Sequence, residues 1–279
     1  MSSLLYPGNE SEACSCSRSI APDKAVALEA RLRECPSVRT LGVRPNFADY
    51  SPQEAALIRG AKKIYYPSTH YVDMFAAMGK STFPSVHTYH FVQDKIKQST
   101  LFALLQVPTP RTRFFFGRGK AEKIRRCFDY PFVAKIARGS ALGRGVFLVR
   151  NRDELEHYCS RVRTAYIQQY LPIDRDVRVV VIGDRIRHAY WRIGAPGRFQ
   201  NNLDQGGRIR LGEVPQKVLA LAGDTARRCG WNDVGLDICL VNDRAYVLEA
   251  NMKYGKQGFR EAGINYAELM EELIGNGEI

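Results

Sequence analysis

The 279-residue chain has the length and composition of a folded protein with one large domain or two smaller ones. Hydrophobic residues make up 45% of it and charged residues 25%, which excludes a chain that is disordered throughout. The longest apolar runs, such as 177–182, are far shorter than the roughly 20 residues needed to cross a bilayer, so no transmembrane helix is expected. With 41 Lys and Arg against 29 Asp and Glu, the net charge of +12 favours anionic partners.

Residues 1–20 are expected to form a flexible tail, because Ser, Cys, Glu, Gly and Pro occur there without periodicity. They lack the basic and apolar regions of a secretory signal, so we expect a cytoplasmic protein. The seven cysteines are odd in number and scattered, which is typical of reduced thiols. Cys14 and Cys16 lie close together, but no further ligands complete a metal site there.

Residues 21–93 are predicted to form a short strand-and-helix unit of the parallel type. The pattern predicts its elements in chain order: a helix over 25–34, a strand over 38–43, a helix that starts at Ser51 and Pro52 and ends near residue 60, a strand over 64–66, and a helix over 68–79 capped by Ser68. The unit is short for a complete domain.

A second module begins at Asp94, where an amphipathic helix starts that Pro108 and Pro110 prevent from continuing. Strands and helices then alternate, and two tight turns, 183–184 and 242–243, predict hairpins. The expected elements are strand 112–116, helix 120–128, strand 132–137, strand 146–149, helix 152–163, strand 166–170, strands 177–182 and 186–193, helix 216–229, strands 236–241 and 245–249, and a closing helix.

Lys135 lies inside an apolar strand and is followed by a glycine-rich loop. A buried ammonium group needs an anion beside it, and several glycines let backbone N–H groups approach phosphate oxygens. The loop residues that carry this interpretation are Gly139, Ser140, Gly143 and Gly145. We therefore predict a nucleotide phosphate site; the alternative is a lysine at a strand end that reaches water beside an ordinary turn.

Three oxygen-bearing side chains converge on the last predicted hairpin. Asp237 and Glu249 can lie side by side on its paired strands, and Asn251 points the same way because side chains alternate along a strand. Hard oxygen ligands that are completed by phosphate and water are typical of a magnesium site in phosphoryl-transfer enzymes. The alternative is a hairpin with solvated acids.

Further polar residues lie between these two motifs, namely Asp176, Arg178, Arg192 and Asn202. Arginines directed into a cleft can neutralise a phosphoryl group in transfer or hold a substrate carboxylate. Taken singly, each arginine is more often a surface residue.

Taken in order, these motifs resemble the ATP-grasp superfamily and, within it, the RimK-type amino-acid ligases, which include ribosomal-protein glutamate ligases. The resemblance covers about 94–274 and rests on nine segments: 94–95, 132–135, 139–146, 168–171, 176–178, 192, 202 with 206–207, 235–237, and 249–251. It implies an α/β (α+β) ATP-grasp fold over 94–279, with a lid subdomain over about 111–170 and a core with the metal site over about 171–275. The unit over 21–93 would be a short, incomplete Rossmann-like domain.

The resemblance also implies a role for each matching residue. ATP would be bound by Lys95, Lys135, the loop residues Gly139, Ser140, Gly143 and Gly145, the hinge Gln169, Tyr170 and Leu171, and Asp176. Arg178, Arg192 and Asn202 would act on the transferred phosphoryl group or the acyl phosphate. Magnesium or manganese, usually two ions, would be held by Asp237, Glu249 and Asn251.

The implied activity is an ATP-dependent carboxylate–amine ligase that forms an amide or peptide bond through an acyl phosphate, with an amino acid such as glutamate as one substrate. The partners would be a small-molecule or peptide carboxylate and an amine acceptor, and an acidic protein or peptide also fits the basic charge. Two alternatives stay open: a phosphotransferase without an amine acceptor, and a basic RNA- or ribosome-binding module with weak catalysis. Gln169 stands where many relatives have Glu, and Met252-Lys253 stands where they have a Pro-Gly turn, so specificity is not implied.

Overall fold

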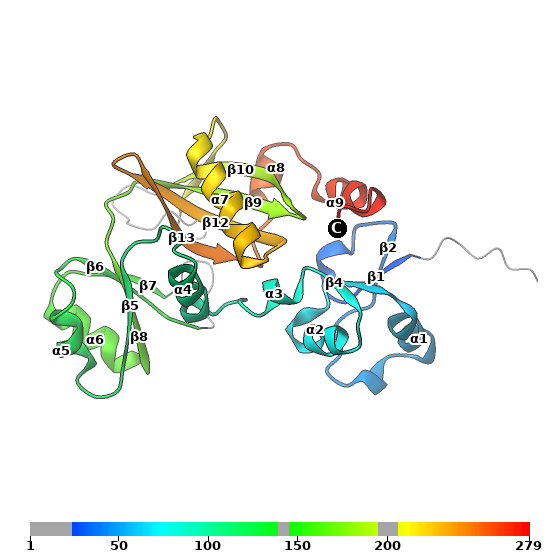
Figure 1. Cartoon of the computed structure of the whole chain (residues 1–279), viewed down its shortest axis with the longest axis horizontal. Helices are drawn as coiled ribbons and strands as arrows, with labels where there is room; N and C mark the ends of the chain where they lie inside the picture. The colour runs from blue at the N-terminus through cyan, green and yellow to red at the C-terminus, as the bar shows by residue number, and fades with distance from the viewer. Residues whose placement is uncertain (1–23, 139–144, 195–205) are drawn as a thin grey trace, which may run out of the picture.

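The structure, a computed structural model, describes residues 24–138, 145–194 and 206–279, which form three sheets (Figure 1). We call them the N-terminal sheet (β1–β4), the lid sheet (β5–β8) and the core sheet (β9–β13). In Figure 1 the N-terminal sheet lies at the lower right, the lid sheet at the lower left, and the core sheet above them. No helix in the described ranges is long and apolar enough to span a membrane.

The N-terminal sheet is parallel throughout, as predicted, with the strand order β2-β1-β3-β4. Its strands are β1 (Ala25–Ala27), β2 (Val38–Thr40), β3 (Lys63–Tyr65) and β4 (Ser81–Phe83). The connecting elements are the 3-10 turns η1 (Ala30–Leu32) and η2 (Phe47–Asp49) and the helices α1 (Pro52–Gly60), α2 (Ser68–Ala77) and α3 (Val86–Tyr89). The short strand β4 was not predicted.

The predicted helix over 25–34 is wrong, because this segment forms strand β1 followed by the turn η1. Ala27 and Leu28 are fully buried in the N-terminal unit. A central strand of a parallel sheet is apolar on both faces, so its sequence has no alternation that separates it from a buried helix.

Helix capping was predicted correctly at one helix and wrongly at the next. Ser51 forms a capping box on α1: its hydroxyl accepts from the Glu54 N–H over 3.3 Å, and Glu54 accepts from the Ser51 N–H over 2.9 Å. Ser68 does not cap α2, because the cap position is Pro67 and the Ser68 hydroxyl is buried without a hydrogen-bond partner.

The lid sheet is antiparallel, with the order β5-β8-β6-β7. Its strands are β5 (Thr112–Phe116), β6 (Phe132–Lys135), β7 (Val146–Val149) and β8 (Thr164–Gln169). Helices α5 (Lys120–Arg125) and α6 (Arg152–Arg161) bury Ile124 and Leu155 against Phe132 and Ile167 of the sheet. This subdomain therefore has a core of its own.

The core sheet is antiparallel, with the order β11-β10-β9-β12-β13. Its strands are β9 (Arg175–Ile182), β10 (Arg185–Ile193), β11 (Arg208–Arg210), β12 (Asp233–Val241) and β13 (Arg244–Asn251). Both predicted hairpin turns are present: Gly183, Asn242 and Asp243 have the positive φ that tight turns of this kind require.

Helices cover both faces of the core sheet. Helices α4 (Lys95–Leu104) and α7 (Gln216–Cys229) pack on one face, where Phe102 and Val218 meet Val179 and Leu236. Helices α8 (Gln257–Glu261) and α9 (Tyr266–Gly275) pack on the other. Residues of the N-terminal unit, such as Leu32 and Phe83, share this second core with Val180 and Met270. The N-terminal unit is thus joined to the core sheet by buried apolar contacts.

Candidate functional site

The register of the core sheet brings the predicted metal ligands together. Asp237 on β12 lies opposite Glu249 on β13, as predicted from the hairpin. Asn251 donates a hydrogen bond from Nδ2 to Asp237 Oδ2 over 3.1 Å. The register shifts between Asp237 and Ile238, which leaves Leu248 of β13 without a residue opposite it.

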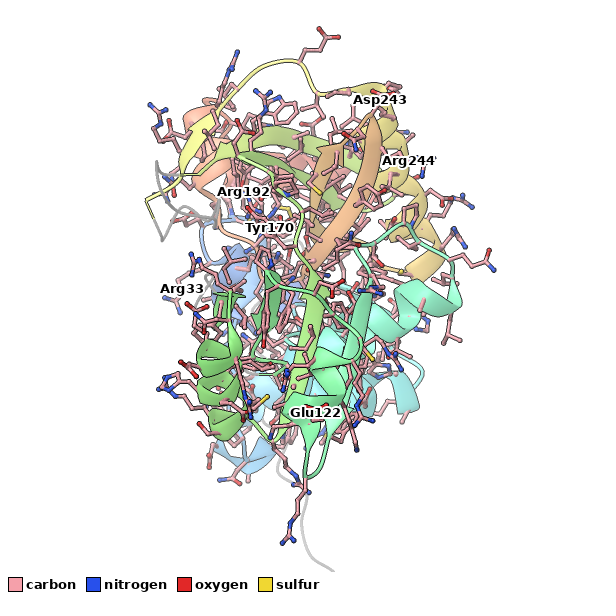
Figure 2. All side chains as sticks on the ribbon, turned by 90° about the vertical axis from the view of Figure 1, so that its left-hand side faces the viewer. Arg33, Glu122, Tyr170, Arg192, Asp243 and Arg244 are labelled. Atoms are coloured by element: carbon pink, nitrogen blue, oxygen red, sulfur yellow. The ribbon has the colours of Figure 1, made fainter. Side chains whose placement is uncertain are left out.

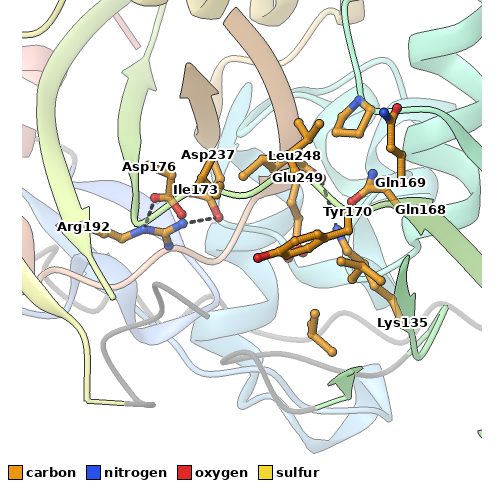
Figure 3. A pocket seen from close by; sticks show the side chains of 14 residues that line it. Lys135, Gln168, Gln169, Tyr170, Ile173, Asp176, Arg192, Asp237, Leu248 and Glu249 are labelled. Carbon is orange, nitrogen blue, oxygen red and sulfur yellow. Dashed lines mark hydrogen bonds and ion pairs between the residues drawn. The ribbon is translucent and has the colours of Figure 1, made fainter. Parts of the chain in front are cut away.

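Two arginines on neighbouring strands surround the same Asp237 carboxylate. Arg178 on β9 donates from Nη2 to Asp237 Oδ2 over 3.1 Å, and its Nε donates to Oδ1. Arg192 on β10 lies between two acids: its Nη2 is 2.9 Å from Asp237 Oδ2, and its Nε donates to Asp176 Oδ1 over 2.7 Å (Figure 3). All four side chains are at most 10% exposed. We call these four residues the Asp–Arg array.

The two aspartates of the array respond differently to burial. Burial raises the pKa of Asp176, and Arg192 only partly offsets it. Burial also acts to raise the pKa of Asp237, but Arg178 and Arg192 outweigh it, so that the pKa of this carboxyl lies below its ordinary value. Asp237 is therefore ionised at neutral pH, as a metal ligand must be.

A glycine makes room for this arrangement. A Cβ atom on Gly235 would lie 2.9 Å from Cδ of Arg178 and 3.0 Å from Cβ of Tyr254. The absence of a side chain at Gly235 therefore leaves space for the Arg178 side chain, whose register partner on β12 is Asp237, two residues further on.

Two lysines approach the same carboxylates from outside the core sheet. Lys135 of the lid strand β6 donates from Nζ to the backbone carbonyl of Leu248 over 3.4 Å, and burial lowers its pKa. Lys95, the first residue of α4, lies 3.4 Å from Glu249 Oε1. Asp94 caps α4 and pairs with Arg138 over 2.9 Å, which ties the start of this helix to the end of β6.

A pocket of about 690 Å³, including open solvent at its mouth, lies where the lid and core sheets meet (Figure 3). Among the predicted residues, its wall contains Lys135, Gln169, Tyr170, Leu171, Asp176, Arg192, Asp237 and Glu249. Figure 2 shows Tyr170 and Arg192 between the two lobes of the molecule. Arg178, Asn251 and Lys95 reach the same place through their contacts with Asp237 and Glu249. Gly145 lies at the start of β7, whereas Gly139, Ser140, Gly143 and Asn202 lie outside the described residues.

Sequence reasoning missed the other residues that line this pocket. They are mostly apolar: Pro110, Val133, Val146, Gln168, Ile173 and Leu248. Gln168 is buried and donates from its amide to Thr112 Oγ1 over 3.0 Å. Such residues carry no chemical signal in a sequence, since any half-buried strand contains them. For Val133, Val146 and Gln168, the signal that could have indicated them is their position inside the matched segments 132–135, 139–146 and 168–171.

The donor set fits magnesium when substrate phosphates complete it. In the described ranges no group of three or more His, Cys, Asp or Glu side chains is placed to hold a metal ion. Asp237, Glu249 and the amide oxygen of Asn251 are hard oxygen donors on adjacent strands, and both carboxylates already face cations. Magnesium commonly takes only one or two protein carboxylates and fills its other positions with water and phosphate oxygens.

Residues 92–274 match the family model of the RimK-like ATP-grasp domain, which is more than half of the chain. The chain belongs to the RimK-like ATP-grasp family. A probable alpha-L-glutamate ligase of Shewanella loihica is 27% identical over 248 residues, 86% of this chain and 80% of that protein. A beta-citrylglutamate synthase B of Danio rerio is 31% identical over 181 residues, 60% of this chain and 44% of that protein.

Solved structures agree with this fold. The crystal structure of a RimK-domain ATP-grasp protein of Sphaerobacter thermophilus has a TM-score of 0.67 at 19% identity, covering 89% of this chain and 98% of that one. The predicted ATP-grasp fold is thereby confirmed. Family and named relatives together identify this RimK-like chain as an ATP-dependent carboxylate–amine ligase, as the sequence predicted.

The start of β7 in this ligase offers a test of the glycine-rich segment. Gly145 has a φ of +87°, and a Cβ there would lie 2.8 Å from the Ile136 side chain. We expect Gly145→Ala to cost about 2 kcal/mol, from left-handed strain and the clash together, and to weaken ATP binding. Gly117→Ala is the control, because its φ is +75° and a Cβ there would have no atom within 4 Å, so that left-handed strain alone should cost about 1 kcal/mol. Urea unfolding measures the stability of the two variants, and nucleotide titration measures their affinity for ATP. Equal losses of stability in the two variants would contradict the predicted clash.

Proposed function

We propose that this ligase converts a substrate carboxylate to an acyl phosphate with ATP and then transfers the acyl group to an amine, with ADP and phosphate released. The observation that carries the proposal is the buried Asp–Arg array. It lies next to Lys95 and Lys135, at the pocket between the lid and core sheets whose other lining residues are mostly apolar. The reaction brings two anions together, so positive charge in a site shielded from water is its main physical requirement.

Lys95 and Lys135 are proposed to bind the ATP phosphates. Both are buried, at 7% and 6% exposure, and both face Glu249 or its neighbour Leu248. Four cations, Lys95, Lys135, Arg178 and Arg192, stand against the three carboxylates of Asp176, Asp237 and Glu249. This small positive excess is attractive to a triphosphate but not to an uncharged ligand. The loop Gly139, Ser140, Gly143 and Gly145 is proposed to close over the phosphates.

The adenine is proposed to lie between the lid and core sheets at the hinge Gln169, Tyr170 and Leu171. Val133, Val146 and Leu248 provide apolar surface on both sides of a planar base. The backbone N–H of Gln169 already donates to the Arg111 carbonyl over 2.8 Å, so any hinge N–H that donates to the base is proposed to come from the residues after it. A contact from Asp176 to the ribose stays a prediction, since this side chain supports Arg192 in the structure.

Magnesium is proposed to bind at Asp237, Glu249 and Asn251, where it would neutralise phosphate charge; two ions are the expected number. Arg178 and Arg192 are proposed to stabilise the charge that develops on the transferred phosphoryl group. Their pairing with Asp176 and Asp237 fixes their positions before substrate arrives, so that no reorganisation is required at the moment of reaction. Asn202 is proposed to hold the acyl substrate.

Glutamate is proposed as one substrate, because the similar protein of Shewanella loihica is named a probable alpha-L-glutamate ligase. A peptide acceptor is proposed as the other. A solved structure of the ligase PsnB with a minimal precursor has a TM-score of 0.64, and one with a phosphomimetic variant of that precursor, Mg and ADP has a TM-score of 0.66. We further propose that 94–279 acts as one catalytic module with the lid over 111–170 and the core over 171–275.

The proposal is tested by a magnesium-dependent ATP assay with a panel of amino acids and small carboxylates, with hydroxylamine added as the amine. An acyl phosphate gives a hydroxamate, which mass spectrometry detects and which identifies the carboxylate. We expect ADP and hydroxamate in equal amounts. Formation of ADP without hydroxamate for every carboxylate that stimulates turnover would contradict acyl transfer and would favour a phosphotransferase.

A further inference from the structure

The outer edge of the core sheet carries arginines that the proposed chemistry does not use. Strand β11 is the first strand in the sheet order and pairs only with β10 among the described residues. Arg208 and Arg210 on β11 are exposed, and no carboxylate of the described ranges pairs with either. An exposed edge strand presents unpaired backbone N–H and C=O groups in addition to its side chains.

Two residues of neighbouring strands extend this basic edge. Trp191 lies opposite Arg210 in the register, so both side chains are on one face of the sheet, and the Arg175 guanidinium lies 5.4 Å from the centre of the indole ring. Trp191 donates from Nε1 to the Glu213 carbonyl over 3.1 Å, which fixes the ring. Arg175, Trp191 and Arg210 line a hollow of about 540 Å³ with Ile193, Gly212 and Glu213. We call Arg175, Trp191, Arg208 and Arg210 the arginine edge.

The spacing of the arginine edge matches an extended polypeptide. Arg208 and Arg210 are two residues apart on one strand, so their side chains repeat about 6.6–6.8 Å apart on one face. A peptide strand paired with β11 would have the same repeat and would place acidic side chains at positions i and i+2 beside these two arginines. Nucleic acid fits less well, because Arg175 already stacks on Trp191 and, among the residues that the structure describes, no other aromatic residue lines this hollow as a stacking platform.

The arginine edge lies directly behind the proposed catalytic centre. Trp191 and Arg175 are followed in the chain by Arg192 and Asp176, whose side chains point to the opposite face and line the ATP pocket. Figure 2 shows Arg192 below the yellow strand at the upper left, which is β11. We propose that the arginine edge docks an acidic polypeptide as an added β-strand and so delivers a polypeptide substrate to this ligase; the substrate role rests on the proposed function.

The test compares the double variant Arg208→Gln/Arg210→Gln with the control Arg185→Gln/Arg244→Gln. The control removes the same charge from exposed positions away from β11: Arg185 is at the start of β10, whereas β11 pairs with the end of that strand, and Arg244 is on β13, the opposite edge strand of the sheet. The probes are a fluorescent peptide with glutamate at alternate positions, an isomer with its glutamates in one block, a backbone N-methylated form, and an oligouridine of equal charge. Binding is measured by anisotropy near 0.15 M salt, and hydroxamate formation from free amino acids is measured in parallel.

We expect the alternating peptide to bind best and the Arg208/Arg210 variant to bind it about tenfold more weakly, with the control within about twofold of wild type. N-methylation should weaken binding, and hydroxamate formation should be unchanged in both variants. Equal peptide binding by both variants, or binding of oligouridine in place of peptide, would overturn the docking surface while leaving the ligase reaction standing. Peptide binding in a wild-type protein that forms no hydroxamate would instead overturn the proposed function and with it the substrate role.

Discussion

Replacing Glu249 by glutamine is expected to lower magnesium-dependent turnover by about a thousandfold, because it removes the charge of one of two carboxylates proposed to hold the metal. The fold should survive, since the Glu249 side chain is 22% exposed and its ion pair in the structure is one contact of 3.4 Å to Lys95. Steady-state rates across a magnesium series measure the effect, and excess magnesium should restore part of the activity. Turnover that is unchanged at every magnesium concentration would contradict the proposed site.

Two further variants are compared with Glu249→Gln, one as a control for the lost charge and one at the second proposed metal carboxylate. Glu272→Gln removes the same charge from an exposed position on α9 and should leave turnover and its magnesium dependence unchanged. Asp237→Asn should abolish turnover as Glu249→Gln does, but it should also destabilise the fold by about 3 kcal/mol, because it leaves two buried arginines with one ionised acid fewer. An acid on a solvated hairpin would tolerate this change without loss of stability, whereas the buried pairs of Asp237 with Arg178 and Arg192 make the change costly.

The pH dependence of unfolding tests whether the lost stability of Asp237→Asn comes from the lost charge of this carboxylate. The pKa of Asp237 is lowered in the fold, so its ionised form stabilises the protein above the ordinary carboxyl value of about 4, and this stabilisation is lost as the pH falls through the lowered value. The difference in unfolding free energy between wild type and Asp237→Asn should therefore shrink below about pH 4.

The sequence was sufficient for pairs of residues that are close along the chain. The turn at Asn242 and Asp243 pairs the two strands and brings Asp237 near Glu249. Counting from the turn alone would place Leu248 opposite Asp237, and the register shift at Leu248, which was not predicted, brings Glu249 there. The contacts of Asp237 with Arg178 and Arg192 could not be predicted in the same way. They require β9 to lie between β10 and β12, an order that no local signal specifies.

Burial was the second property that the sequence did not reveal. The sequence pattern of a strand is the same whether its arginine faces water or a buried acid. Taken singly, Arg178 was therefore expected on the surface. In the structure its side chain is 10% exposed, because Gly235 leaves space for it next to its register partner Asp237. The error at 25–34 has the same origin, since Val26 and Ala27 are buried by neighbours that lie far away in the chain.

Replacing Lys135 by methionine is expected to weaken ATP binding by about a hundredfold without loss of stability at neutral pH. Methionine is similar in length but cannot bind a phosphate, which accounts for the lost affinity. Burial lowers the pKa of Lys135, which means that the fold disfavours its charged form. At pH 7 the variant should thus be as stable as wild type or more stable, and this difference should shrink as the pH rises toward the ordinary lysine value of about 10.4.

The matched control is Lys120→Met, because this lid lysine also donates to a backbone carbonyl, that of Val162 over 2.6 Å, but does not line the proposed ATP pocket. ATP titration should find its affinity unchanged, and urea unfolding at pH 7 and pH 10 measures stability for both variants. A Lys135→Met protein that binds ATP like wild type would contradict the phosphate role. A large loss of stability with retained ATP binding would show that Lys135 is a structural residue whose bond to the Leu248 carbonyl holds the lid against the core. If stability is kept while ATP binding is lost, then burial disfavours the charge of Lys135 in the absence of ATP, and the bound phosphates require it.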